Sequence, residues 1–162
     1  MTLVLFRIDE RLLHGQVIVG WGMRLGIVYY VLVGDGLAES DWEQDLYSAG
    51  LPEQTTADFV SVAQAIERFG ELDARPGRGA LLTRGTGEMR ALAEAGLLAG
   101  RRINLGGLHA AEGRRRVLTY VCLTRGEEED LKVIAETSSR VTARDLPASR
   151  EVDLRDLVDV VD

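Results

Sequence analysis

The stretch that decides the fold lies at residues 3–17 and reads LVLFRIDERLLHGQV. The apolar run at 3–6 predicts a buried strand, and residues 16–25 predict a helix that Gly26 closes. A loop that carries His14 therefore connects the first strand to the first helix. In open α/β sheets, ligands bind at the carboxyl ends of strands, where such loops lie. A helix start offers free N–H groups and the positive end of its dipole, so this loop favours an anion.

Apolar runs alternate with helical patterns along the rest of the chain. We expect strands at 3–6, 28–33, 58–62, 80–83, 102–105, 117–123 and 140–143, and helices at 16–25, 41–49, 63–69, 86–98, 127–137 and 153–160. Such alternation is typical of βαβ units. The 162 residues are enough for one sizeable core. The predicted fold is a single α/β domain over 1–162, a three-layer sandwich with a mostly parallel central sheet.

The composition excludes several classes of protein. The net charge of −7 argues against a nucleic-acid partner, and the arginines at 101–102 and 114–116 are interpreted as solvated loop residues. Cys122 is the only cysteine, so no internal disulfide forms, and its apolar neighbours predict a buried strand position. No apolar stretch approaches the roughly 20 residues of a membrane span, and no signal pattern opens the chain. We therefore expect a cytoplasmic protein.

The motif around His14 resembles that of one known family. Arg-x-Asp-x-Arg-Leu-x-His-Gly-Gln-Val at 7–17, with Trp21 beyond it, is similar to the enzyme IIB component of the bacterial phosphotransferase system (PTS), mannose/fructose/sorbose type. The segments at 33–38, 103–107 and 121–124 resemble family segments in the same order. The resemblance implies that His14 accepts a phosphoryl group, through Nδ1, from a IIA protein or domain and passes it to a sugar. It implies membrane IIC/IID subunits as further partners and a cytoplasmic location peripheral to that transporter. It implies no metal or other cofactor, and it leaves open whether the protein forms a homodimer.

The residues around His14 suggest supporting roles. The guanidinium of Arg11 can hold two phosphate oxygens, and with Arg7 it would make this face locally positive. Asp9 would repel a phosphoryl group directly, so we expect it to orient the ring of His14 or to hold Arg11. Gln16 either donates to the phosphate or only starts the helix. Gly15 would let the backbone approach the anion or adopt a positive φ.

Two further strand ends suggest walls of the same site. Gly106 and Gly107 follow the strand at 102–105 and form either an anion nest, a site wall or a plain turn, of which we favour the wall. Thr83 can donate its hydroxyl to phosphate, although Arg84-Gly85 stands where the family often has Asn-Pro. His109 lies beyond the glycine pair and is assigned no role.

Other interpretations of the sequence are weaker. Trp21 is assigned to packing or to a partner surface. The glycines at 34 and 36 lack the third glycine of a dinucleotide-binding loop, and neither histidine has a second metal ligand at helical spacing. Two alternatives stay open: a regulatory phosphate relay that is not coupled to transport, and a non-catalytic module that binds a phosphorylated ligand. A nucleotide-binding enzyme is a distant third.

Overall fold

A central sheet organises the computed structural model, which describes residues 1–158. Its seven strands run in the order β3-β2-β4-β1-β5-β8-β9. Their bounds are Leu3–Ile8 for β1, Ile27–Val33 for β2, Thr56–Val60 for β3, Arg78–Thr83 for β4, Arg102–Leu105 for β5, Arg140–Ala143 for β8 and Val152–Asp153 for β9. The pairs are parallel except for β8 with β9. The predicted α/β fold with a mostly parallel sheet is confirmed.

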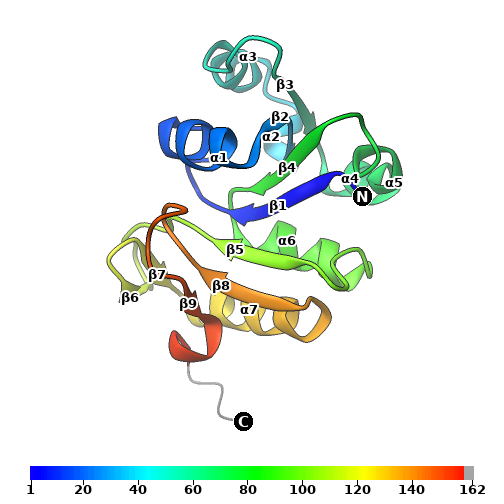
Figure 1. The fold of residues 1–162 in the computed structure, drawn as a ribbon. Coiled ribbons are helices and arrows are strands. Elements are labelled where there is room, and N and C mark those ends of the chain that lie inside the picture. The colour runs from blue at the N-terminus through cyan, green and yellow to red at the C-terminus, as the bar shows by residue number, and fades with distance from the viewer. Residues whose placement is uncertain (159–162) are drawn as a thin grey trace.

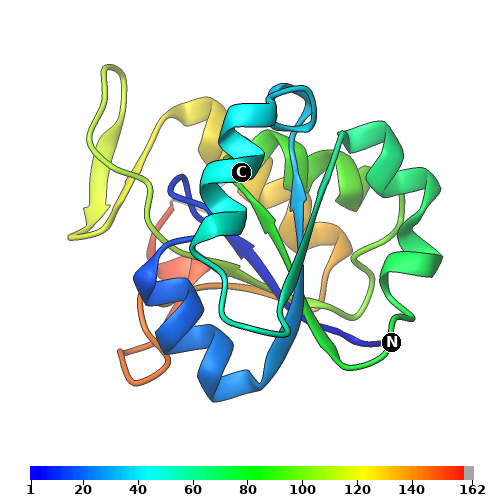
Figure 2. The ribbon, with the colours of Figure 1, turned by 90° about the horizontal axis from the view of Figure 1, so that it is seen from above.

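Helices cover both faces of this sheet (Figures 1 and 2). One layer holds the π-helix η1 (Gln16–Gly22), which continues as α1 (Met23–Leu25), together with α2 (Asp35–Ala38) and α3 (Asp41–Ala49). The opposite layer holds α4 (Val62–Glu67), α5 (Phe69–Leu72), α6 (Thr86–Glu94) and α7 (Arg125–Thr137). The three predicted layers are therefore present.

The alternation of side chains along the strands creates two cores. On β1, Leu5 packs into the cluster under η1, while Phe6 and Ile8 pack into the cluster under the α4–α7 layer. Successive strand residues point to opposite faces, so a strand between two helical layers is apolar throughout. This explains the apolar residues at positions 3, 5 and 6, whereas Val4 is 40% exposed near the start of the strand.

Several predicted boundaries shift for local reasons. The strand expected at 58–62 is Thr56–Val60, because Ser61 caps α4 and forms a capping box with Gln64. The helix expected at 63–69 is divided at Arg68 into α4 and α5. The helix expected at 86–98 ends at Glu94, and Gly96 beyond it adopts φ +80°, a conformation that glycine favours.

The single strand expected at 117–123 is wrong. The chain forms instead an antiparallel hairpin of β6 (Arg115–Leu118) and β7 (Val121–Leu123), outside the main sheet. Thr119 and Tyr120 make the turn although both are residues that strands favour, so the pattern gave no turn signal. Leu108 bridges to Val121, directly after the turn, and so attaches to the hairpin, which stands away from the sheet in Figure 2.

The carboxyl-terminal helix expected at 153–160 is also wrong in its described part. Val152 and Asp153 form β9, and a short 3₁₀ helix, η2 (Leu154–Asp156), follows. Val160 lies outside the described residues. Within 1–158, no helix combines the length and the apolar character that a membrane crossing requires.

Candidate functional site

The site lies where three neighbouring strands end at the carboxyl edge of the sheet. In the ladder, Ile8 of β1 stands opposite Thr83 of β4 and opposite Leu105 of β5. The chain beyond β1 continues between the same neighbours, because Asp9 N–H donates to the carbonyl of Thr83 at 3.0 Å. Strand pairing therefore brings the loop of His14 beside Thr83 and the glycine pair that follows β5, as the sequence predicted.

His14 lies at the start of η1 and remains partly open to solvent. Its carbonyl accepts the N–H of Ile18 at 3.0 Å, which begins the helical turn. About one sixth of its side-chain surface is accessible, at 17%. The helix that follows is a π-helix, a rare form that often occurs at functional sites. His14 is thus fixed by the start of this helix, and its ring can still be reached from solvent.

Asp9 is the centre of the site, although none of its side-chain surface is exposed. Its oxygens accept hydrogen bonds from Arg7 at 3.1 Å, from Arg11 at 3.3 and 3.4 Å, and from the N–H of Arg11 at 3.1 Å. Burial by itself raises the pKa of this carboxyl, but His14 and the two guanidiniums hold the pKa well below its usual range. Asp9 is therefore a carboxylate that only accepts hydrogen bonds.

This carboxylate fixes the orientation of the His14 ring. Nε2 of His14 lies 3.3 Å from Oδ2 of Asp9. Because the carboxylate accepts, Nε2 must carry the proton of this pair, so Nδ1 of a neutral ring bears the lone pair. Asp9 is thus placed to orient the ring of His14, and its hydrogen bonds to Arg11 also place it to hold Arg11, the two roles that the sequence suggested.

Arg11 is the cation that an incoming anion can reach. Its side chain is 34% exposed, and Nη2 donates to Gln16 Oε1 at 3.2 Å as well as to Asp9. Its Nη1 group has no hydrogen-bond partner within residues 1–158. The guanidinium is thus oriented on one side and has free donors on the other, as a clamp for phosphate oxygens requires.

Arg7 does not contribute positive charge to the surface, which corrects our expectation. Its side chain is completely buried, and its Nη atoms donate to Asp9, to Asn104 Oδ1 and to the carbonyls of Arg144 and Asp145 at 2.8 and 3.1 Å. Burial lowers the pKa of Arg7 even though Asp9 raises it. Arg7 is therefore a buried counter-ion of Asp9, and a ligand at the surface cannot contact it.

The two glycines after β5 form a wall against which both arginines pack. A Cβ at Gly106 would lie 2.4 Å from the guanidinium of Arg7, and one at Gly107 would lie 3.1 Å from that of Arg11. The N–H of Gly106 donates to the carbonyl of Ile8 at 2.7 Å, so it is not free to bind an anion. The geometry matches the predicted wall and argues against a nest made from both amides.

Three residues predicted to lie at the anion site make local interactions instead. The Thr83 hydroxyl donates its proton to the carbonyl of Gly85 at 2.8 Å, so it meets a phosphate only if this bond breaks. Gly15 adopts φ −51°, which excludes the predicted positive φ, and the strained conformation falls instead on Leu12 at φ +55°. Gln16 is the first residue of η1 and accepts from Arg11.

Sequence reasoning missed Asn104 as part of the site. Its side chain accepts from Arg7, and the only sequence signal was a polar residue in a buried strand directly before the glycine pair. Trp21 packs as predicted: it is 7% exposed, lies 5.2 Å under the Arg7 guanidinium and donates Nε1–H to the carbonyl of Asp145 at 2.9 Å. Both residues hold Arg7 in place.

Four arginines of the clusters at 101–102 and 114–116 form ion pairs: Arg101, Arg102, Arg114 and Arg115. Arg101 lies 2.6 Å from Asp73, Arg102 lies 3.1 Å from Glu151, and Arg115 lies 2.9 Å from Glu128. The idea that these residues are simply solvated is therefore too coarse.

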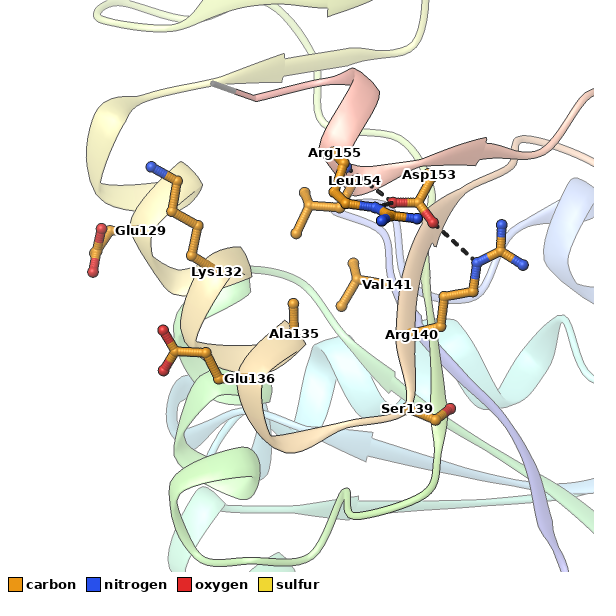
Figure 3. A pocket seen from close by; sticks show the side chains of 10 residues that line it. All are labelled: Glu129, Lys132, Ala135, Glu136, Ser139, Arg140, Val141, Asp153, Leu154 and Arg155. Atoms are coloured by element: carbon orange, nitrogen blue, oxygen red, sulfur yellow. Dashed lines mark hydrogen bonds and ion pairs between the residues drawn. The ribbon is translucent and has the colours of Figure 1, made fainter. Parts of the chain in front are cut away.

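A groove of about 710 Å³ lies elsewhere, between α7, β8 and η2 (Figure 3). Asp153 bonds both Arg140 and Arg155 there, at 3.0 and 3.2 Å. A smaller hollow of about 330 Å³ lies at the ends of β2 and β4, and Leu12 of the His14 loop is among the residues that line it. Within residues 1–158, no group of three or more His, Cys, Asp and Glu side chains is arranged to bind a metal ion.

Comparison with known proteins gives a consistent result. The family described as PTS system sorbose subfamily IIB component matches residues 3–161. The N-acetylgalactosamine-specific phosphotransferase enzyme IIB component 1 of Escherichia coli (strain K12) is 29% identical over 159 residues, which cover 96% of this chain and 98% of that protein. The fructose-specific EIIB component of Bacillus subtilis (strain 168) is 25% identical, with 94% and 93% covered. The mannose-specific EIIAB component of Escherichia coli (strain K12) is 25% identical over 100% of this chain but only 50% of that protein.

Solved structures agree with these relatives. The PTS system N-acetylgalactosamine-specific IIB component 1 from Escherichia coli has a TM-score of 0.84 at 28% identity, with 93% of this chain and 98% of that chain covered. The IIBSor domain of the sorbose permease from Klebsiella pneumoniae has a TM-score of 0.88 with 99% of both chains covered. At 18% identity, that second likeness concerns the fold alone.

Proposed function

Because the chain belongs to the sorbose subfamily of PTS system IIB components, which act in sugar phosphotransfer, we propose that it is a phosphocarrier with His14 as the carrier residue. Phosphorylated IIA donates the phosphoryl group to His14. The group then passes to a sugar during uptake through the membrane subunits. In this reaction residues 1–162 act as one IIB domain.

The tautomer held by Asp9 is the observation that carries this proposal. In the first step the lone pair of His14 Nδ1 attacks phosphorus, and the bond from phosphorus to the donor nitrogen breaks. Nε2 keeps its proton, so the ring gains positive charge, which the carboxylate 3.3 Å away stabilises. In the second step a sugar hydroxyl attacks phosphorus, the P–N bond breaks, and the electron pair returns to Nδ1. The hydroxyl proton leaves to solvent or to a base on the transporter.

Arg11 stabilises the group in transit. Phosphoryl transfer spreads charge over three equatorial oxygens, and catalysis is mainly positioning and electrostatic stabilisation. The free donors of Arg11 are the exposed cationic groups beside His14, while Arg7 stays buried under Asp9. The carboxylate that orients the ring is thus shielded by two cations from the incoming phosphoryl group.

The partners follow from the reaction. A relative named EIIAB is twice the length of the region matched here, which supports a IIA protein or domain as donor. The acceptor sugar is presented by the IIC/IID membrane subunits, so this protein works at the cytoplasmic side, peripheral to the transporter. The transfer step requires no metal and no nucleotide.

Incubation with ³²P-labelled IIA tests the proposal. We expect an acid-labile label on the wild-type protein, no label on His14→Ala, and full label on His109→Ala, which is the matched control. Label that persists on His14→Ala would refute the assignment of the carrier residue. A wild-type protein that binds phosphorylated IIA but acquires no label would be a non-catalytic module.

A further inference from the structure

Glu10 connects the His14 loop to a distant part of the chain. It stands between Asp9 and Arg11, and its N–H donates to the carbonyl of Gly107 at 2.9 Å. Its Oε1 accepts the backbone N–H of His109 at 2.7 Å and also contacts Nδ1 of that ring. Its Oε2 accepts from Arg114 at 3.1 Å. The side chain next to the proposed phosphoryl site is therefore tied to the segment between β5 and the hairpin.

Arg114 joins three segments through one guanidinium. Besides Glu10, it donates to the carbonyl of His109 at 2.7 Å and bonds Glu127 bidentately at 3.0 and 2.8 Å. Glu127 in turn accepts the N–H of Thr124, which caps α7. Arg114 is only 15% exposed, and Glu127 is 17% exposed. Fork-shaped, partly buried bonds of this kind are stronger and more directional than surface ion pairs.

The charges also bear on phosphoryl transfer. Glu10 is a second carboxylate in the loop that must receive a multiply charged anion, and like charges repel. Burial raises the pKa of the Glu10 carboxyl, but the hydrogen bonds from His109 and Arg114 lower it by more, so the carboxylate stays ionised and needs a compensating cation. Arg114 supplies that cation at 3.1 Å and leaves Arg11 free to face the anion.

We propose that Arg114 is a positioning residue for phosphoryl transfer: through Glu10 it holds the His14 loop against the base of the β6–β7 hairpin and neutralises the carboxylate beside the site. The inference rests on the proposed function. Arg114 does not contact His14 and acts through Glu10. Its loss releases the loop that carries Asp9 and Arg11, and a small displacement of reacting groups lowers a transfer rate strongly.

The neighbouring ion pair provides a matched control. Arg115 pairs with Glu128 at 2.9 Å on the same hairpin, is 62% exposed, and makes no bond to the His14 loop. Arg115→Ala removes the same charge from the adjacent position. It should leave both the transfer rate and its dependence on donor concentration at wild-type values.

The experiment measures the rate of His14 phosphorylation against the concentration of phosphorylated IIA. For Arg114→Ala we expect the plateau rate to fall about fivefold or more, with little change in the half-saturating concentration. Arg114→Lys should recover part of the rate, since it restores the charge but not the fork. Once Glu10 is changed to Gln, the further change Arg114→Ala should cost much less. All rates are taken well below each variant's melting temperature.

Two outcomes separate this inference from the proposed function. If the wild type is labelled and Arg114→Ala reaches the wild-type plateau rate, the inference is wrong and the phosphocarrier function stands. If the wild type is not labelled, the proposed function fails, and NMR signals of the His14 ring and the Asp9 amide still report the linkage. Shifts in Arg114→Ala but not in Arg115→Ala support the positioning role, and unchanged signals in both refute it.

Discussion

Replacing Asp9 by Asn tests the centre of the site most directly. The amide has nearly the shape of the carboxylate but no charge, so Arg7 becomes a fully buried cation without a counter-ion. Breaking one partner of a buried pair costs about 3 kcal/mol or more. For a protein of this size each kcal/mol corresponds to roughly 2–4 °C, so we expect the melting temperature to fall by about 6–12 °C.

The same change affects the nucleophile. If the Asn amide group turns its N–H₂ towards Nε2 of His14, that nitrogen must accept, and the ring proton moves to Nδ1, where the lone pair is needed. A histidine held in the wrong tautomer loses about 10²–10⁴-fold in rate. Single-turnover labelling by phosphorylated IIA measures this loss. Asp41→Asn on the exposed start of α3 is the control and should change neither quantity.

The pH dependence of unfolding gives an independent measure of how much the Asp9 carboxylate contributes to stability. The pKa of Asp9 is lower in the folded protein than in the unfolded chain, where it is about 3.9. Its stabilisation is therefore fully present above that value and is lost as pH falls towards the lowered folded pKa. Below about pH 4 the wild type should lose stability more steeply than Asp9→Asn. If transfer by Asp9→Asn at pH 7 matches the wild type, Asp9 has only a structural role, and unchanged stability would refute the buried network.

Three further predictions follow from the geometry around the site. Arg11→Ala should slow labelling about tenfold or more, in line with the loss of a charge-assisted bond of about 1.5–3 kcal/mol, and should barely change the melting temperature; a wild-type rate would make it a surface charge. Gly106→Ala should destabilise the protein and slow transfer, since its Cβ would collide with a buried guanidinium, whereas Gly15→Ala, with open space and a helical φ, should be neutral or stabilising by denaturant unfolding. Because one exposed arginine and not two faces the donor, the association rate with IIA should fall only modestly as salt rises, and a steep fall would indicate further cations at the interface.

The local signals in the sequence were sufficient for most elements. The apolar run at 3–6 predicted a buried strand, which forms with only Val4 of the run exposed, and the alternation of strands with helices predicted the mostly parallel sheet that the structure contains. The motif at 7–17 placed His14 between strand and helix. Each of these inferences depends on residues close together in the chain, which is why sequence alone sufficed.

The sequence failed where residues distant in the chain decide the conformation. The hairpin at 115–123 depends on Leu108, which bridges to Val121, and not on a turn signal of its own. Gly15 was expected to let the backbone approach the anion or to adopt a positive φ, but the positive φ falls on Leu12, whose side chain is buried with Leu13 in the cluster under η1. Neither effect is encoded by the composition of a short window.

The charged residues of the site show most clearly what the sequence determined and what the tertiary structure determined. The sequence showed that Arg7, Asp9, Arg11 and His14 occur together, and it determined the residue types that phosphoryl chemistry needs. Only the fold decided that Arg7 lies fully buried among Asn104, Trp21 and two carbonyls while Arg11 remains partly exposed. Both arginines have the same chemistry. The hydrogen-bond acceptors that distinguish Arg7, on Asn104, Arg144 and Asp145, lie roughly 100 to 140 residues away along the chain, and the pairing of parallel strands brings them to one edge of the sheet.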